Sequence, residues 1–132
     1  MMKILVTGAS GRMGQAVQQA VAQNAQTELA STHDVGQDIA EAFSAADIAI
    51  DFSFHGFTPE LLKVALAQNK PLVIGTTGHT AEERAAIVEA SSQIPIVFAS
   101  NYSVGVNTLF WLTRKATRIL RDYDIEIVEM HH

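Results

Sequence analysis

Three glycines spaced three residues apart follow the first apolar run of the chain. Gly8, Gly11 and Gly14 come directly after the apolar segment at residues 3–7, and a helical pattern begins at residue 12. Such a loop leaves backbone N–H groups and the positive end of the helix dipole open to an anion. Gly8 would allow the sharp turn, Gly11 the close approach of a pyrophosphate, and Gly14 tight packing of the helix on the sheet. The spacing predicts a phosphate-binding loop; taken alone, a purely structural turn is the alternative.

An acidic residue stands where a dinucleotide site requires one. Asp34 follows a second predicted strand, at residues 28–33, and lies twenty residues after Gly14. A carboxylate in this place accepts hydrogen bonds from the ribose hydroxyls of adenosine, although Asp34 alone could be an ordinary surface residue. Loop and acid together predict a dinucleotide site. NADH is the expected cofactor because Asp34 would repel the 2′-phosphate of NADPH, and NADPH could also be accepted because Arg12 and His33 lie nearby.

Composition and charge exclude several other kinds of site. The 132 residues fit one domain, and the formal net charge is −5 with nine Lys and Arg that form no basic run. A nucleic-acid surface is therefore not expected. Without cysteine there is no disulfide or thiolate metal site, and no metal ligand set is predicted. No stretch of about 18 apolar residues and no secretory signal is found, which predicts no membrane association and a cytoplasmic location.

Short apolar runs alternate with helical patterns along the chain. Strands are predicted at 3–7, 28–33, 47–52, 71–75, 94–99 and 125–130, and helices at 12–25, 59–68, 81–91 and 106–120. A short helix at 38–43 stands where a full dinucleotide fold would place its third strand. The alternation predicts an α/β fold: a Rossmann-like, doubly wound parallel sheet with an abbreviated first half.

Several side chains have a predicted structural role. Thr58 is expected to cap a helix with Pro59 at its first position, and Thr80 with Glu83 to form a capping box. Ser103 and Asn107 belong to a motif that is named below. They could instead serve only as caps of the last predicted helix. Three histidines are predicted to be loop residues without a chemical role: His33, His55 and His79.

Five motifs occur in a recognisable order across the whole chain. They are VTGASGRMG at 6–14, DFS at 51–53, GTTG at 75–78, NYSVGVN at 101–107 and DYDIEIVEMHH at 122–132. With these motifs the sequence resembles the 4-hydroxy-tetrahydrodipicolinate reductase family, also called dihydrodipicolinate reductase, of lysine and diaminopimelate biosynthesis. The resemblance implies hydride transfer from a reduced nicotinamide to a cyclic, unsaturated dicarboxylate imine derivative, and then protonation of the adjacent carbon.

The resemblance also implies roles for particular residues. His131 matches the general acid or substrate-orienting histidine and His132 a contact to a substrate carboxylate, although the pair could also be the stub of an affinity tag. The implied cofactor-binding residues are Gly8, Ser10, Gly11, Arg12, Met13, Asp34, Phe52, Ser53, Gly75, Thr77, Gly78, Ser100, Asn101 and Tyr102.

The sequence departs from the family after the paired histidines. The family continues into a basic stretch with a catalytic lysine, a substrate loop, and a sheet-rich domain that makes a homotetramer. Residues 1–132 are therefore expected to be one dinucleotide-binding domain that ends at the junction to a missing substrate and tetramerisation domain, and to be inactive alone. The oligomeric state of the fragment stays open.

Two other functions remain as alternatives. One is a stand-alone NAD(H)-binding module that senses redox state without chemistry. The other is a fragment of a short-chain dehydrogenase, which is disfavoured because Tyr102 and Tyr123 are followed four residues later by Val106 and Ile127, where that class needs lysine.

Overall fold

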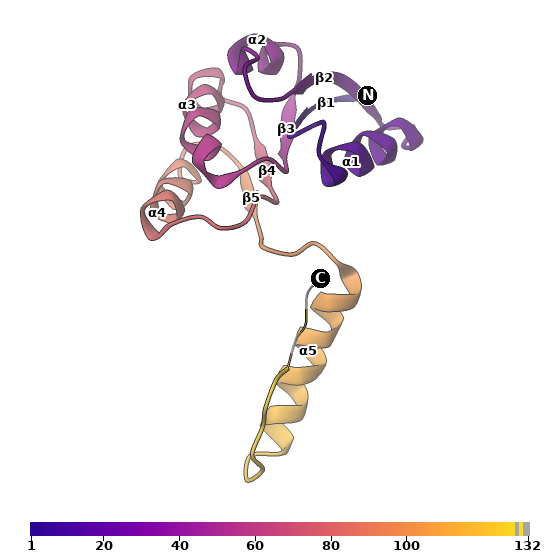
Figure 1. The fold of residues 1–132 in the computed structure, drawn as a ribbon, viewed down its shortest axis with the longest axis vertical. Coiled ribbons are helices and arrows are strands. Elements are labelled where there is room, and N and C mark those ends of the chain that lie inside the picture. Colours follow the sequence, from indigo (N-terminus) through magenta and orange to yellow (C-terminus); the bar gives the residue numbers. More distant parts are fainter. Residues whose placement is uncertain (129, 131–132) are drawn as a thin grey trace. The chain divides into compact units, whose positions relative to one another are not determined.

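The computed structural model describes residues 1–128 and 130. The chain divides into two compact units, Met1–Ser100 and Asn101–His132. The first unit carries the whole sheet (Figure 1). In the described part of the chain, no helix is both long enough and apolar enough to cross a membrane.

The sheet of the first unit is parallel throughout, with the strand order β2-β1-β3-β4-β5. Its strands are β1 (Met2–Thr7), β2 (Thr27–His33), β3 (Ile48–Asp51), β4 (Leu72–Ile74) and β5 (Ile96–Phe98). All five were predicted, and only the short helix α2 (Ile39–Ser44) separates β2 from β3. The fold class is confirmed as a Rossmann-like α/β sheet whose first half is abbreviated.

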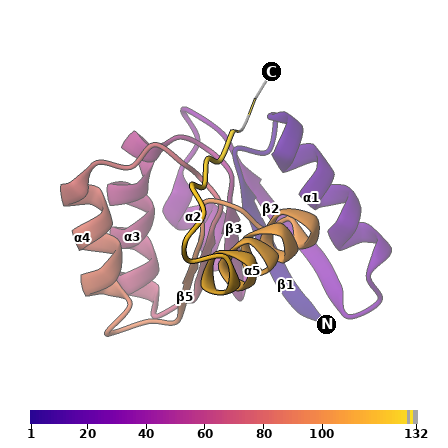
Figure 2. The ribbon, with the colours of Figure 1, turned by 90° about the horizontal axis from the view of Figure 1, so that it is seen from below.

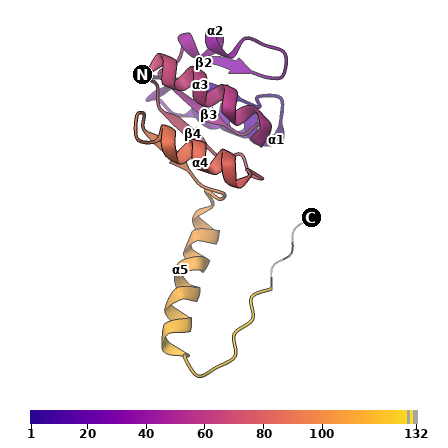
Figure 3. The ribbon, with the colours of Figure 1, turned by 90° about the vertical axis from the view of Figure 1, so that its left-hand side faces the viewer.

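Helices cover both faces of this sheet. Helix α1 (Arg12–Gln23) lies on one face, and α3 (Thr58–Gln68) and α4 (Ala81–Ala90) lie side by side on the other (Figures 2 and 3). Successive residues of β1 serve the two faces, because side chains alternate along a strand. Ile4 and Val6 pack in one apolar cluster with Val21 of α1, whereas Leu5 packs in the other with Phe43 of α2.

The helix starts differ in how well the sequence predicts them. Thr80 and Glu83 form the expected capping box at α4. The predicted role of Thr58 as the N-cap of α3 is wrong. Thr58 is the first residue of the helix, and a 3-10 turn, η1 (His55–Phe57), leads into it. Its hydroxyl lies 2.8 Å from Nε2 of His79, a residue far along the chain, and so does not cap α3.

The second unit contains helix α5 (Val104–Ile119), which begins two residues earlier than predicted. Ser103 caps it by accepting a hydrogen bond from the Val106 amide. The predicted strand at 125–130 is wrong for the residues that the structure describes, because 125–128 and 130 pair with no other strand. Ile127 and Val128 are accordingly about four-fifths exposed, at 75% and 81%, since a strand needs a neighbour to bond its backbone and cover its side chains.

The prediction that three histidines are loop residues is wrong for His33, holds for His79, and places His55 in a segment that forms a 3-10 turn. His33 is the last residue of β2 and is buried, and His79 is buried in the β4–α4 loop. His55 lies in the 3-10 turn before α3 and pairs with Glu83. Each histidine therefore holds a loop at the carboxyl edge of the sheet.

Candidate functional site

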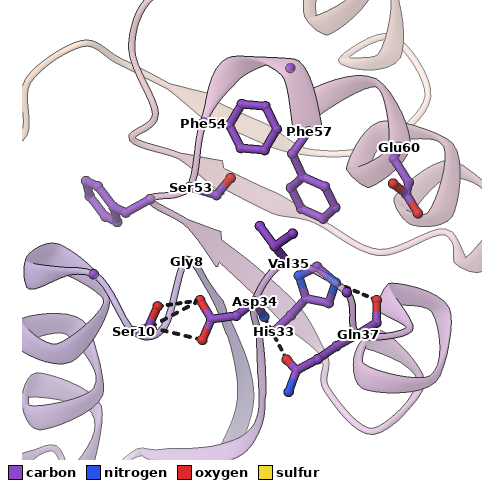
Figure 4. A pocket seen from close by; sticks show the side chains of 14 residues that line it. Gly8, Ser10, His33, Asp34, Val35, Gln37, Ser53, Phe54, Phe57 and Glu60 are labelled. Atoms are coloured by element: carbon purple, nitrogen blue, oxygen red, sulfur yellow. Dashed lines mark hydrogen bonds between the residues drawn. The ribbon is translucent and has the colours of Figure 1, made fainter.

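A cavity of about 440 Å³ lies at the carboxyl edge of the sheet (Figure 4). Its walls come from the loops after β1, β2 and β3. The chain leaves β1 and β3 toward opposite faces, so the cavity lies at the point where the winding of the sheet reverses, which is where open α/β sheets bind ligands. Six predicted cofactor contacts line it: Gly8, Ser10, Gly11, Asp34, Phe52 and Ser53.

The glycine loop is shaped by contacts that exclude side chains. Gly8 has a φ of 69°, in the left-handed region, and a Cβ there would overlap the carbonyl oxygen of Phe52. Its amide donates to the carbonyl of His33 at 2.9 Å. A Cβ on Gly14 would overlap the carbonyl oxygen of Gly8, so this glycine packs against the loop as well as opening α1. Gly8 and Gly14 are thus required by the fold itself.

Gly11 has space around its Cβ position, whereas Gly8 and Gly14 do not. A Cβ there would meet only the Gly8 carbonyl oxygen, at 3.2 Å, and Gly11 is the N-cap residue of α1. Among the described residues no side chain caps this helix, and no acid lies in its first turn. The positive end of the helix dipole therefore faces outward without a resident anion.

Asp34 is joined to the glycine loop. Its carboxylate accepts from the Ser10 amide at 3.1 and 3.2 Å and from the Ser10 hydroxyl at 3.1 Å. The Asp34 amide in turn donates to Oε1 of Gln37 at 2.7 Å. Figure 4 shows this carboxylate beside Ser10 at the edge of the cavity. A carboxylate has about four lone-pair sites, so Asp34 keeps acceptor capacity for a ligand hydroxyl.

The far wall of the cavity is aromatic. The His33 ring stacks on Phe57, with centroids 4.9 Å apart and planes 15° apart. Nε2 of His33 lies 3.0 Å from the carbonyl of Gln37. The His33 ring is therefore held in this wall by stacking and hydrogen bonding.

A buried carboxylate next to the cavity is a feature that sequence reasoning missed. Asp51 ends β3 and is fully buried. It accepts from the hydroxyls of Thr7 (2.6 Å), Ser53 (2.5 Å) and Thr76 (2.7 Å), and the Ser53 amide donates to Oγ1 of Thr76 at 2.9 Å. This network joins the ends of β1 and β3 to the loop after β4. The sequence signal for this buried carboxylate is an acidic residue directly after the apolar run IAI; the DFS motif includes Asp51 but does not by itself indicate that the side chain is buried.

The remaining predicted residues lie outside the cavity lining. Arg12 and Met13 begin α1, and Gly75, Thr77 and Gly78 form the loop after β4. The Phe52 ring fills the space that a Cβ on Gly75 would need, and Gly78 has a φ of 90°. Ser100 ends the first unit, and Asn101 and Tyr102 begin the second. His131 and His132 lie outside the described residues.

The strand order and the glycine loop at the reversal point define a Rossmann-like α/β domain. A family model described as dihydrodipicolinate reductase, N-terminus, matches residues 2–102. The chain belongs to this family, as its five motifs predict.

Relatives and a solved structure agree with this assignment. The whole chain aligns with the 4-hydroxy-tetrahydrodipicolinate reductases of Akkermansia muciniphila, at 65% identity, and Campylobacter jejuni, at 42%. It covers 54% of each, so it spans about half the length of these curated relatives. A dipicolinate-bound dihydrodipicolinate reductase from Paenisporosarcina sp. TG-14 matches with a TM-score of 0.72 at 22% identity, over 89% of this chain and 54% of that one. At that identity the structure supports the fold.

Proposed function

We propose that this chain is the nicotinamide-dinucleotide-binding half of a 4-hydroxy-tetrahydrodipicolinate reductase, which acts in the cytoplasm in lysine and diaminopimelate biosynthesis. The observation that carries the proposal is the joining of the glycine loop to the acid after β2: Ser10 donates from its amide and its hydroxyl to Asp34 at the edge of one cavity. The names of the relatives favour this role over a stand-alone redox-sensing module.

The residues present fit a dinucleotide. The open face of Gly11 and the uncapped start of α1 suit a pyrophosphate, and Asp34 suits the adenosine ribose. The bound reduced nicotinamide would supply the hydride. Its half of the cofactor would be met by Phe52, Ser53, Gly75, Thr77, Gly78, Ser100, Asn101 and Tyr102. NADH is the proposed cofactor, with NADPH bound more weakly.

The substrate is proposed to be a cyclic dihydrodipicolinate-type dicarboxylate. His131 would act as general acid or orient the substrate, and His132 would contact a carboxylate. Because the chain spans about half the length of its relatives, we propose that reduction requires the rest of that length, in a homotetrameric enzyme with no bound metal. Positioning and general acid catalysis each contribute factors on the order of 10² or more.

Isothermal titration with NADH tests the binding half of the proposal. The wild-type chain should bind saturably. Gly11→Asp should abolish binding, because the new side chain would fill the open face of the loop and its charge would repel the pyrophosphate. Gln19→Asp, on an exposed part of α1 about two turns further along, adds the same charge away from the loop and should bind normally. A folded wild-type chain that binds neither NADH nor NADPH would refute the assignment.

A turnover assay tests the activity half. The purified chain, saturated with NADH and given substrate, should show no reduction. Turnover at about 1 s⁻¹ or faster, which is an ordinary enzyme rate, would show that the reacting groups all lie within these 132 residues.

A further inference from the structure

The loop between β4 and α4 is held by hydrogen bonds at both ends, whereas its two middle residues make none within the described chain. Its first residues are held by β3, because the Gly75 amide donates to the Asp51 carbonyl at 2.8 Å and the Thr76 hydroxyl to the Asp51 carboxylate. Within the described chain, Thr77 and Gly78 have no hydrogen bond, and both are exposed. Their N–H groups are therefore open to a ligand.

The other end of this loop is held by a buried histidine. His79 is 7% exposed, and its Nε2 lies 2.8 Å from Oγ1 of Thr58, which is fully buried at the start of α3. The ring also packs edge-on against Phe98, with centroids 5.2 Å apart. Burial lowers the pKa of His79, which favours the neutral ring. Nδ1 of His79 is buried with no partner among the described residues, which costs free energy that the fold must recover elsewhere.

A second side-chain contact, between His55 and Glu83, also holds this end of the loop. Nδ1 of His55 lies 3.0 Å from both carboxylate oxygens of Glu83, and Glu83 also accepts from the Thr80 amide at 2.8 Å. The Glu83 side chain is 16% exposed, and that of His55 45%. The two contacts connect the η1–α3 segment that follows β3 with the end of the β4–α4 loop and the first turn of α4.

We propose that His79 and the His55–Glu83 pair are positioning residues that hold the 75–78 turn in the shape that receives the dinucleotide. The inference rests on the proposed function, since it gives the open N–H groups of Thr77 and Gly78 a ligand. Gly78, at a φ of 90°, has many other conformations available to it. The tie at His79 restricts this freedom before the ligand arrives.

The expected effect follows from the fraction of molecules whose turn is already in the binding shape. Apparent Kd rises in inverse proportion to that fraction. If loss of the Thr58 contact lowers the fraction to about a fifth, His79→Ala should raise the Kd for NADH about fivefold. His79→Gln, whose terminal amide can replace Nε2 at the Thr58 hydroxyl, should bring the Kd back to within about twofold of wild type.

The experiment is a fluorescence titration of the whole chain with NADH, beside urea unfolding of each variant. Glu83→Gln removes the carboxylate that contacts Nδ1 of His55 and should raise the Kd about twofold to fivefold. Glu82→Gln is the matched control: it removes the same charge from the same turn of α4, away from His55, and should leave the Kd unchanged. If His79→Ala does not fold, Thr58→Val removes the same contact from the other side.

The outcomes separate this inference from the function on which it rests. Raised Kd values in folded variants, with rescue by His79→Gln, support it. Variants that are less stable but bind NADH as tightly as wild type would show that the ties are only structural and would overturn it. A wild-type chain that does not bind NADH would overturn the proposed function first, and this inference with it.

Discussion

The charge of Asp34 should set a preference for NADH over NADPH. The 2′-phosphate of NADPH carries about −1.5 to −2 charges at neutral pH. At about 4 Å, two unit charges interact by roughly 1 kcal/mol in water, so the repulsion from this half-buried carboxylate is about 1.5–2 kcal/mol. That corresponds to a Kd for NADPH about tenfold to thirtyfold higher than the Kd for NADH. The positive charge of Arg12 at the start of α1 should bring this ratio toward tenfold.

Replacing Asp34 separates its charge from its hydrogen bonds. Asp34→Asn removes the charge but keeps an oxygen that can accept from Ser10, so the glycine loop should hold and the two cofactors should bind nearly equally. Asp34→Ala also removes the ribose acceptor and should weaken NADH as well. Glu28→Gln, at the opposite end of β2 and exposed, removes one charge far from the cavity and should leave the preference unchanged.

Titration of both cofactors at low and high salt is the deciding assay. Salt screens exposed charges, with a Debye length of about 10 Å at 0.1 M, so the preference for NADH should shrink as salt rises. Equal affinities at low salt, or tighter binding of NADPH, would refute the reasoning. An Asp34→Asn variant with the wild-type preference would refute it equally. His33 is not expected to offset Asp34, because its ring is stacked and bonded within the wall.

Three further predictions concern stability, each checked by urea unfolding. Asp51→Asn should lower the unfolding free energy by about 2 kcal/mol, because an NH₂ group would face a hydroxyl that now donates; a change under about 0.5 kcal/mol would contradict this. Gly14→Ala should destabilise by roughly 1–3 kcal/mol, because the new Cβ would overlap the Gly8 carbonyl, and a stabilised variant would mean that helix propensity decides. Hydrogen bonds from His55 and from a backbone amide lower the pKa of Glu83, so its contribution is present above the unfolded pKa, about 4.3, and is lost as pH falls through the lowered folded value. The midpoint difference between wild type and Glu83→Gln should therefore shrink from pH 6 to pH 3, and a constant difference would count against a stabilising role of the ionised Glu83 carboxylate.

The sheet could be predicted from sequence because its signals are local. Strands buried on both faces are apolar almost without alternation, and the centres of β1, β3 and β4 read ILV, IAI and LVI. The capping box at Thr80 is local too, since both of its hydrogen bonds close within four residues. The predicted strand at 125–130 failed for the opposite reason: its pattern is that of a strand, but the described residues offer it no partner.

Side-chain networks could not be predicted because their partners are distant in sequence. Asp51 meets Thr7 and Thr76, which are 44 and 25 residues away, and His79 meets Thr58 across 21 residues. Only the winding of the sheet brings these groups to one edge. The same tertiary contact explains why Thr58, a good cap by sequence, caps nothing.

The hydrogen bonds of the glycine loop limit which of its amides can meet a phosphate. The Ser10 amide is committed to Asp34, and the Gly11 amide donates to the Gly8 carbonyl at 3.1 Å. The first amides of the described loop left open are therefore those of Arg12 and Met13, in the first turn of α1, where the helix dipole is most favourable to an anion. Because Asp34 both fixes Ser10 and offers its remaining lone pairs to a ribose, loop shape and sugar recognition depend on one carboxylate. Removing only its charge therefore tests recognition without collapsing the loop that would carry it.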